Sequence, residues 1–238
     1  MIGALTNPQR FLAFSGWAAP LLGVLAALLG LAGLWFDFTA PPDYQQGYTV
    51  HLMFLHVPAA WMSLFVYLCL GGASLLALVF RLPMAEAAAR AAAPLGAGFT
   101  ILALATGSLW ARPMWGTWWV WDARLTSVVV LLLFYLAYIA LQSALDDEAK
   151  ADRACAILAL VGLVNLPIVH FSVVWWNTLH QGASVFRAGG PAMPPVYLIP
   201  LLTLALAYMA GFGAVWLVRI RAEVWRRRAE AAALKAGA

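Results

Sequence analysis

The sequence predicts an all-α, polytopic membrane protein with six transmembrane helices and both termini in the cytoplasm. Two features of composition point to this class: 64% of the 238 residues are hydrophobic and only 10% are charged, whereas about a quarter of the residues of a soluble domain are charged. The third observation is the spacing of the charges, which leaves six long charge-free runs. Composition therefore excludes a water-soluble globule, a disordered chain and a nucleic-acid-binding protein, despite the net charge of +4.

The six charge-free runs predict the six spans in chain order. Each run is at least as long as the ~20 apolar residues that an α-helix needs to cross about 30 Å of hydrocarbon. The runs do not alternate apolar and polar residues as the strands of a transmembrane barrel do. The first run is too long for the apolar part of a signal peptide, so we expect it to remain as a span. The runs cover residues 11–36, 44–80, 91–111, 125–145, 154–186 and 188–218.

The basic residues predict how these spans are oriented. With a cytoplasmic N-terminus, 11 of the 14 Lys and Arg residues lie on the cytoplasmic side, which is where short loops are enriched in Lys and Arg. The loops after the first, third and fifth spans then face outward. We expect the whole chain, 1–238, to form one transmembrane domain. Its basic tail, 219–238, is predicted to continue the last helix and to contact anionic lipid headgroups.

The outward segment 110–127 holds five of the twelve tryptophans and an aspartate. If this segment is helical, three tryptophans and the aspartate share one face, because they recur at i, i+3, i+4 and i+7; an extended loop would separate them. Their clustering favours a platform for a large planar amphiphile with acidic groups over an interfacial aromatic belt. The four residues are Trp115, Trp118, Trp119 and Asp122.

Two histidines are candidate iron ligands. His56 and His180 come from different spans and are both expected at the outward surface, where two neutral imidazoles could bind a single iron from opposite sides. The alternative is that both are ordinary polar residues at the interface. His56 lies two residues before Pro58, which predicts the first turn of the second span. His51 is expected to be structural. His170, inside the fifth span, is expected to face the bundle interior and to be buried and hydrogen-bonded.

Three segments resemble a known family. Residues 115–127, WGTWWVWDARLTS, resemble the tryptophan-rich WWD signature of haem-handling membrane proteins. Residues 56–61, HVPAAW, and 171–182, FSVVWWNTLHQG, are similar to those of the CcmC family of cytochrome c maturation proteins. The resemblance covers essentially the whole chain, and the three motifs together are specific.

The resemblance implies roles for particular residues. His56 and His180 match the two external histidines that act as axial ligands of haem b, which is bound as a transported substrate. The outward cations Arg112, Arg124 and Arg187 are expected to meet the haem propionates; alternatively they cap loops or pair with the aspartate. The expected outward haem platform is formed by Trp115, Trp118, Trp119, Trp121 and Asp122.

The resemblance also implies a location and partners. Such a protein lies in the bacterial inner membrane with its haem site facing the periplasm. It presents haem to the chaperone CcmE and works beside the ABC transporter subunits CcmA and CcmB and the small protein CcmD. We expect a binding and transfer protein and not an enzyme, since the sequence has no phosphate loop and no nucleophile–base pair. A membrane b-type cytochrome for electron transfer and a secondary transporter are the alternatives, the latter suggested by His170, Asn165 and Pro167 in the fifth span.

Overall fold

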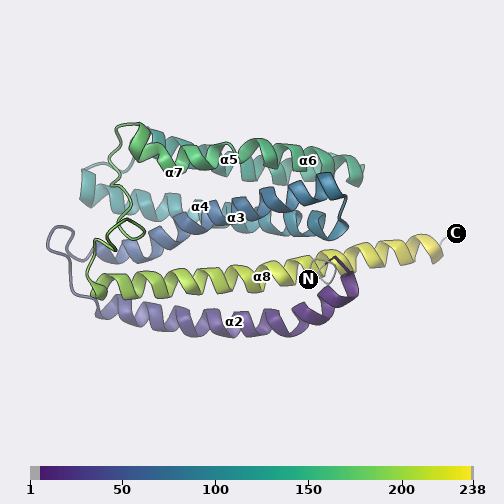
Figure 1. The fold of residues 1–238 in the computed structure, drawn as a ribbon, viewed down its shortest axis with the longest axis horizontal. Helices are drawn as coiled ribbons and strands as arrows, with labels where there is room; N and C mark the ends of the chain where they lie inside the picture. Colours follow the sequence, from purple (N-terminus) through teal and green to yellow (C-terminus); the bar gives the residue numbers. More distant parts are fainter. Residues whose placement is uncertain (1–5, 237–238) are drawn as a thin grey trace.

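The computed structural model describes residues 6–236, and these residues form seven α-helices (Figure 1). Within them, five helices are each long and apolar enough to cross a membrane, and α6 and α7 together make a sixth span, Glu148–Trp175. The prediction of an all-α protein with six spans is therefore confirmed. The helices are α2 (Pro8–Thr39), α3 (Val50–Phe80), α4 (Pro83–Trp115), α5 (Ala123–Ala144), α6 (Glu148–Gly162), α7 (Asn165–Trp175) and α8 (Pro195–Ala236).

The helices form three layers that run along one axis (Figure 1). α2 packs along α8, α3 packs along α4, and α5 lies with α6 and α7 on the far side of the α3–α4 pair. α2 touches α3 very little, so α8 attaches the first span to the bundle. The face of α2 that points away from α8 carries large apolar side chains, as expected of a surface in contact with lipid.

The core lies between α3, α4 and α5 and depends on close approach of the helices. Tyr135 of α5 is fully buried, and its hydroxyl donates to the backbone oxygen of Ser63 at 2.8 Å. A Cβ at Gly96 of α4 would lie 2.1 Å from the Tyr135 ring, so only glycine leaves room for it. Small residues at such contacts are what let membrane helices pack tightly.

The fifth span is broken where α6 ends and α7 begins. Pro167 lies in the first turn of α7, and a proline clashes with the carbonyl four residues earlier, which here belongs to Leu163 in the break. The side-chain amide of Asn165 donates to the backbone oxygen of Ser127 in α5 at 2.9 Å. The polar residue at the break therefore joins two helices of the bundle.

The two ends of the bundle differ in what they hold. The end that we call the terminal end holds the first turn of α2 and the last turns of α8 (Figure 1). The opposite end, the loop end, holds the connections 40–49, 116–122 and 176–194. α8 runs unbroken to Ala236, as predicted for the tail. Its 42 residues span about 63 Å, twice the thickness of the hydrocarbon, so it continues beyond the bundle.

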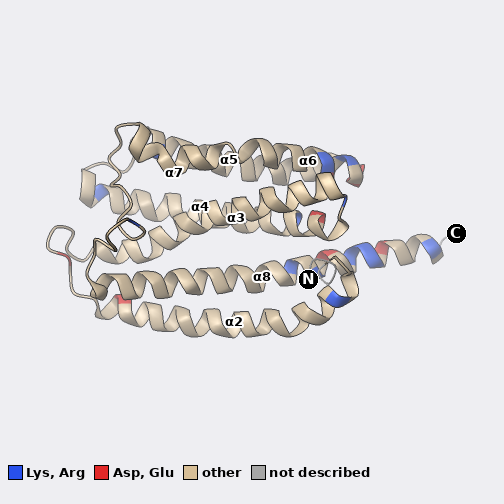
Figure 2. Cartoon of the chain, in the orientation of Figure 1, with Lys and Arg blue, Asp and Glu red and all other residues tan. Residues whose placement is uncertain are grey.

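Most of the charged residues lie at the terminal end (Figure 2), where several are paired across helices. Arg90 of α4 contacts Asp152 and Glu148 of α6 at 2.7 and 2.5 Å, and Glu223 of α8 at 3.5 Å. Arg227 of α8 contacts Glu223 within its own helix and, across helices, Glu86 of α4, in both cases at 2.9 Å. These ion pairs tie α4, α6 and α8 together.

Two expectations about individual residues are wrong. The second span begins only at Val50, so His56 lies in its second turn and Pro58 in the helix interior. The fifth span ends at Trp175, where the chain leaves the helix in an extended conformation at Trp176, so His180 follows the span as expected. His170 is exposed on the outside of α7, where its ring packs edge-on against its neighbour Phe171, and it does not face the bundle interior.

Candidate ligand site at the loop end

His56 is held against α4 by its Nδ1 atom. This nitrogen lies 2.9 Å from the backbone oxygen of Ala103 and 3.3 Å from the hydroxyl of Thr106. Because a carbonyl oxygen only accepts, Nδ1 carries the proton and Nε2 keeps its lone pair. A Cβ at Gly107 would lie 2.7 Å from the His56 ring, so glycine makes room for this imidazole. The ring of Trp110 lies beside it, with centroids 5.7 Å apart.

His180 comes from the loop between α7 and α8. Its ring lies edge-on to Trp115, with centroids 4.8 Å apart, and its Nδ1 faces Oδ2 of Asp122 at 3.9 Å. Burial, together with the positive charge of Arg124, lowers the pKa of His180 to about 4, although Asp122 acts in the opposite direction. The imidazole is therefore neutral at pH 7, which is the form that ligates a metal.

The two histidines lie at the same end of the bundle. The charge of a protonated His56 also disfavours protonation of His180, so the two rings share an electrostatic environment. The last turns of α4 contact both of them, His56 through Trp110 and His180 through Trp115. The last turns of α4 thus bring the surroundings of His56 and His180 to the same end of the bundle.

Polar atoms in this site are buried without partners. Among residues 6–236, Oδ2 of Asp122, Nδ1 of His180 and Nε1 of Trp119 have no hydrogen-bond partner. Oδ1 of Asp122, in contrast, accepts the backbone N–H of Leu125 at 2.8 Å and caps α5. Buried polar groups in native proteins are nearly always paired, so a group of exceptions marks a place where a ligand or a small movement completes the bonding.

The tryptophan segment is a loop and not one helical face. Gly116 adopts φ +76°, a left-handed conformation that ends α4 directly after Trp115. Residues 116–122 then run without a helix to α5, so of the two arrangements open from the sequence the extended one is found. Ser108 holds this loop back against α4 by donating to the backbone oxygen of Trp118 at 2.8 Å. The indoles of Trp118 and Trp121 are exposed.

The outward arginines have different surroundings. Arg124, in the first turn of α5, donates to the hydroxyl of Ser172 at 2.8 Å and to the backbone oxygen of His170 at 3.3 Å, which ties α5 to α7. Arg112 donates to the backbone oxygen of Gly116 at the end of its own helix. Arg187 is exposed in the loop before α8. For Arg112 and Arg124 the structure thus shows the loop-holding contacts that were the alternative to binding a ligand.

Sequence reasoning missed several polar contacts around the site. Nδ1 of His51 lies 2.5 Å from Oδ1 of the buried Asp37, which joins the end of α2 to the start of α3. Nε1 of Trp110 donates to the side-chain oxygen of Gln46 at 3.0 Å, so the 40–49 loop also supports the site. The only signal in the sequence is that Asp37 ends the first charge-free run and that Gln46 and His51 lie near the start of the second.

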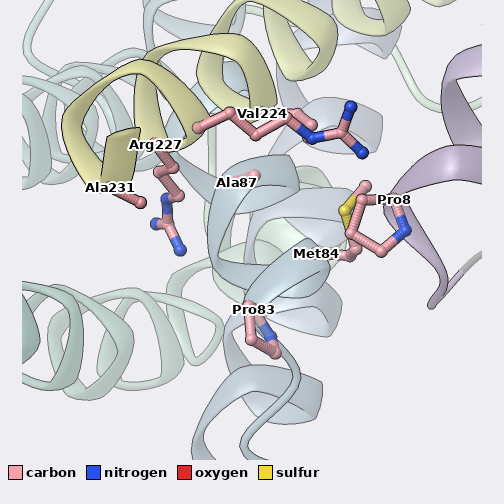
Figure 3. A pocket seen from close by; sticks show the side chains of 8 residues that line it. Pro8, Pro83, Met84, Ala87, Val224, Arg227 and Ala231 are labelled. Carbon is pink, nitrogen blue, oxygen red and sulfur yellow. The ribbon is translucent and has the colours of Figure 1, made fainter. Parts of the chain in front are cut away.

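One hollow of the described structure lies at the terminal end, between α2, α4 and α8. It has a volume of about 190 Å³ and is lined mainly by apolar side chains such as Pro8, Met84 and Val224 (Figure 3). None of the site residues predicted from the sequence lies in this lining. The loop end therefore stays the candidate site on chemical grounds and not on cavity size.

The ligand set at the loop end suits an iron that brings its own equatorial ligands. Within the described residues no group of three or more His, Cys, Asp or Glu side chains could hold a metal ion. Two imidazoles are too few for a zinc or calcium site, but they suffice for the axial positions of a porphyrin iron. The fold and the site thus define a multi-pass helical membrane protein with a tryptophan-lined, two-histidine site at one end of the bundle.

Comparison with known proteins is more specific, and the chain belongs to the heme exporter protein C (CcmC) family. The family model matches residues 1–235. Heme exporter protein C of Bradyrhizobium diazoefficiens is 55% identical over 224 residues, which are 94% of this chain and 85% of that protein. The protein of the same name from Escherichia coli K12 is 49% identical over 79% of this chain and 78% of its own length. A putative cytochrome c biosynthesis ccmC-like mitochondrial protein of Marchantia polymorpha is 42% identical over 82% of this chain and 85% of its own length.

Proposed function

We propose that this protein binds haem b as a transported substrate and passes it on for cytochrome c maturation. The observation that carries the proposal is the pair of imidazoles at the loop end, His56 and His180, which come from distant segments of the chain. His56 has its Nδ1 engaged by α4 and its Nε2 left to face a ligand. His180 is neutral at pH 7, because its pKa is about 4. The names of the relatives, heme exporters, agree with this ligand.

The surroundings of the two histidines support a large planar ligand. The indoles of Trp115 and Trp119 lie in the site, and those of Trp118 and Trp121 extend the aromatic surface into the exposed part of the loop. Such rings stack on a porphyrin. The exposed Arg187 is the best candidate for the propionates, because Arg112 and Arg124 already donate to oxygens of the protein; the charge of Arg124 still reaches His180.

The protein is proposed to lie in the bacterial inner membrane with the loop end in the periplasm. Lys and Arg gather at the terminal end, and basic residues mark the cytoplasmic side of a membrane protein (Figure 2). In this orientation the haem edge faces the compartment in which cytochromes c mature. The exposed Trp118 and Trp121 leave one side of the platform accessible to an acceptor protein. From the family we take CcmE as that acceptor, with CcmA, CcmB and CcmD as the other partners.

The two alternatives have less support. A membrane b-type cytochrome normally carries its ligands inside the hydrocarbon on facing helices, whereas His180 lies in a loop after α7. A transporter uses a broken helix to bind its substrate near the midplane. Here the polar residue at the break, Asn165, is bonded to the backbone of α5.

The test is haem occupancy of the purified protein. We expect His56→Ala and His180→Ala each to lose most of the bound haem and its low-spin absorption spectrum. His170→Ala is the matched control, because it removes an exposed histidine of α7 that lies outside the ligand pair; its occupancy and spectrum should equal those of the wild type. Unchanged occupancy and spectrum in both ligand variants would disprove the axial assignment.

A further inference from the structure

Asp122 uses its two carboxylate oxygens for different purposes. Oδ1 caps α5 by accepting the N–H of Leu125. Oδ2 points the other way, toward Nδ1 of His180 at 3.9 Å. The Asp122 side chain is only 7% exposed, and both facing atoms are buried without a hydrogen-bond partner in the described part of the chain. Two complementary polar atoms, a donor and an acceptor, thus face each other across a short gap.

We propose that Asp122 is a positioning residue that accepts the Nδ1–H of His180 through Oδ2 and makes His180 the stronger of the two axial ligands. The inference rests on the proposed haem-binding function. Closing the gap to a charge-assisted hydrogen bond shortens it by about 1 Å, which a small rotation of the loop-borne imidazole achieves. The edge-on contact with Trp115 restricts the plane in which the ring turns. With Nδ1 bonded to the carboxylate, Nε2 is the nitrogen that faces the iron.

The contrast with His56 gives the proposal its consequence. Nδ1 of His56 faces neutral groups, the backbone oxygen of Ala103 and the hydroxyl of Thr106. A carboxylate draws the proton of an imidazole more strongly than a carbonyl does, so it leaves more electron density on the opposite nitrogen. His180 therefore favours the ferric iron, and His56 is the ligand that dissociates more readily. The site then has one stronger and one weaker axial ligand, which suits a protein that must release the haem that it carries.

The two roles of Asp122 are separable by substitution. Asn and Ser are as good as Asp at the N-cap, so Asp122→Asn and Asp122→Ser keep the cap of α5 and remove the carboxylate. In the purified full-length protein we expect haem affinity to fall about 10- to 100-fold in both variants. The reduction potential of the remaining haem should rise, and its ferric low-spin electron paramagnetic resonance signal should shift. Thermal unfolding of the haem-free protein should stay unchanged.

Thr106→Val is the matched control on the other ligand. It removes a neutral hydroxyl beside His56 and leaves the Ala103 carbonyl in place, so the potential should move less than in the Asp122 variants. A wild-type potential and resonance signal in both Asp122 variants would overturn the inference, and so would lowered thermal stability of both without haem, since that is a purely structural role. If His56→Ala and His180→Ala both retain haem with an unchanged spectrum, the proposed function itself fails. If the two histidine variants lose haem but the Asp122 variants keep the wild-type potential and resonance signal, the proposed function stands and this inference is wrong.

Discussion

The two ends of the bundle differ in how completely their buried polar groups are paired. At the terminal end, Arg90 lies among three carboxylates from α6 and α8, and Arg227 contacts Glu86 and Glu223. Apart from one guanidinium nitrogen on each arginine, the buried side-chain atoms of this network have partners within residues 6–236. At the loop end, Asp122, His180 and Trp119 each leave a buried polar atom facing a neighbour or the site.

This difference agrees with a terminal end that stabilises the fold and a loop end that forms the proposed ligand site. Buried charges that are paired with each other are tolerated, and removing one partner is expensive because the other is left buried and unpaired. Unpaired polar atoms weaken a fold and are kept where something binds. The ion pairs of the terminal end thus hold three helices together, while the unpartnered polar atoms of the loop end mark the proposed ligand site.

The largest expected effect lies at the terminal end. Arg90→Ala removes the cation that joins the largely buried Asp152 and Glu223 to the half-exposed Glu148. This should destabilise the protein by about 3 kcal/mol, the lower end of the cost of breaking a buried ion pair, because Arg226 and Arg227 still contact these carboxylates. Thermal unfolding in detergent measures this loss. The spectrum of haem bound to the protein that stays folded should be unchanged. A normal unfolding midpoint would show that the ion pairs do not fasten the helices.

An intermediate effect is expected at the contact between α4 and His56. Gly107→Ala places a methyl group 2.7 Å from the imidazole ring, and crowding of this kind costs about 1–3 kcal/mol. Haem occupancy should fall because the ring is displaced. Gly98→Ala is the matched control on the same helix, since in the described structure nothing lies within 4 Å of the added methyl. Equal occupancy in the two variants would contradict the tight packing of His56.

The smallest effect compares two tryptophans of equal exposure at opposite ends. Trp118 of the loop end and Trp225 of the terminal end are both 54% exposed. Trp118→Ala should weaken haem retention by about 0.5–1.5 kcal/mol, the worth of one aromatic stacking contact, with little change in unfolding. Trp225→Ala should leave retention unchanged. The measurement is haem loss on washing for both variants. If the tryptophans only form an interfacial belt, the two substitutions should change haem retention equally; if Trp118 belongs to a haem platform, only its substitution should lower retention.

Much of the fold was predictable because membrane spans follow from local composition. Six charge-free runs match six spans, and the unbroken tail of α8 was expected from its sequence. The boundaries were less accurate where charge is not what ends a helix. Gly116 ends α4 through its backbone conformation, and the chain leaves α7 after Trp175 inside a charge-free run. A charge-free run shows which residues can lie in the membrane, but it does not show at which residue the helix ends.

The site was predictable as a set of residues but not as an arrangement. Parity of the spans predicts His56, His180 and the tryptophan segment at one end, and in the structure these histidines contact Trp110 and Trp115 at the end of α4. The tryptophan segment adopts the loop, one of the two arrangements that its sequence left open, and His170 is exposed, contrary to expectation. The spacing of residues within one segment does not reveal which side of a helix meets its neighbours, because that depends on how the whole bundle packs.

The sequence by itself determined the class of the protein, the number of its spans, the gathering of its histidines and tryptophans, and the motifs that identify its family. Only the tertiary structure decided which atoms meet. Ala103 bonds a histidine 47 positions earlier in the chain, and Oδ2 of Asp122 faces His180 from another loop. The reason is that the free energy of moving a segment from water to lipid depends on the composition of that segment alone. A hydrogen bond instead needs a partner at about 3 Å, and only the packing of distant segments provides it.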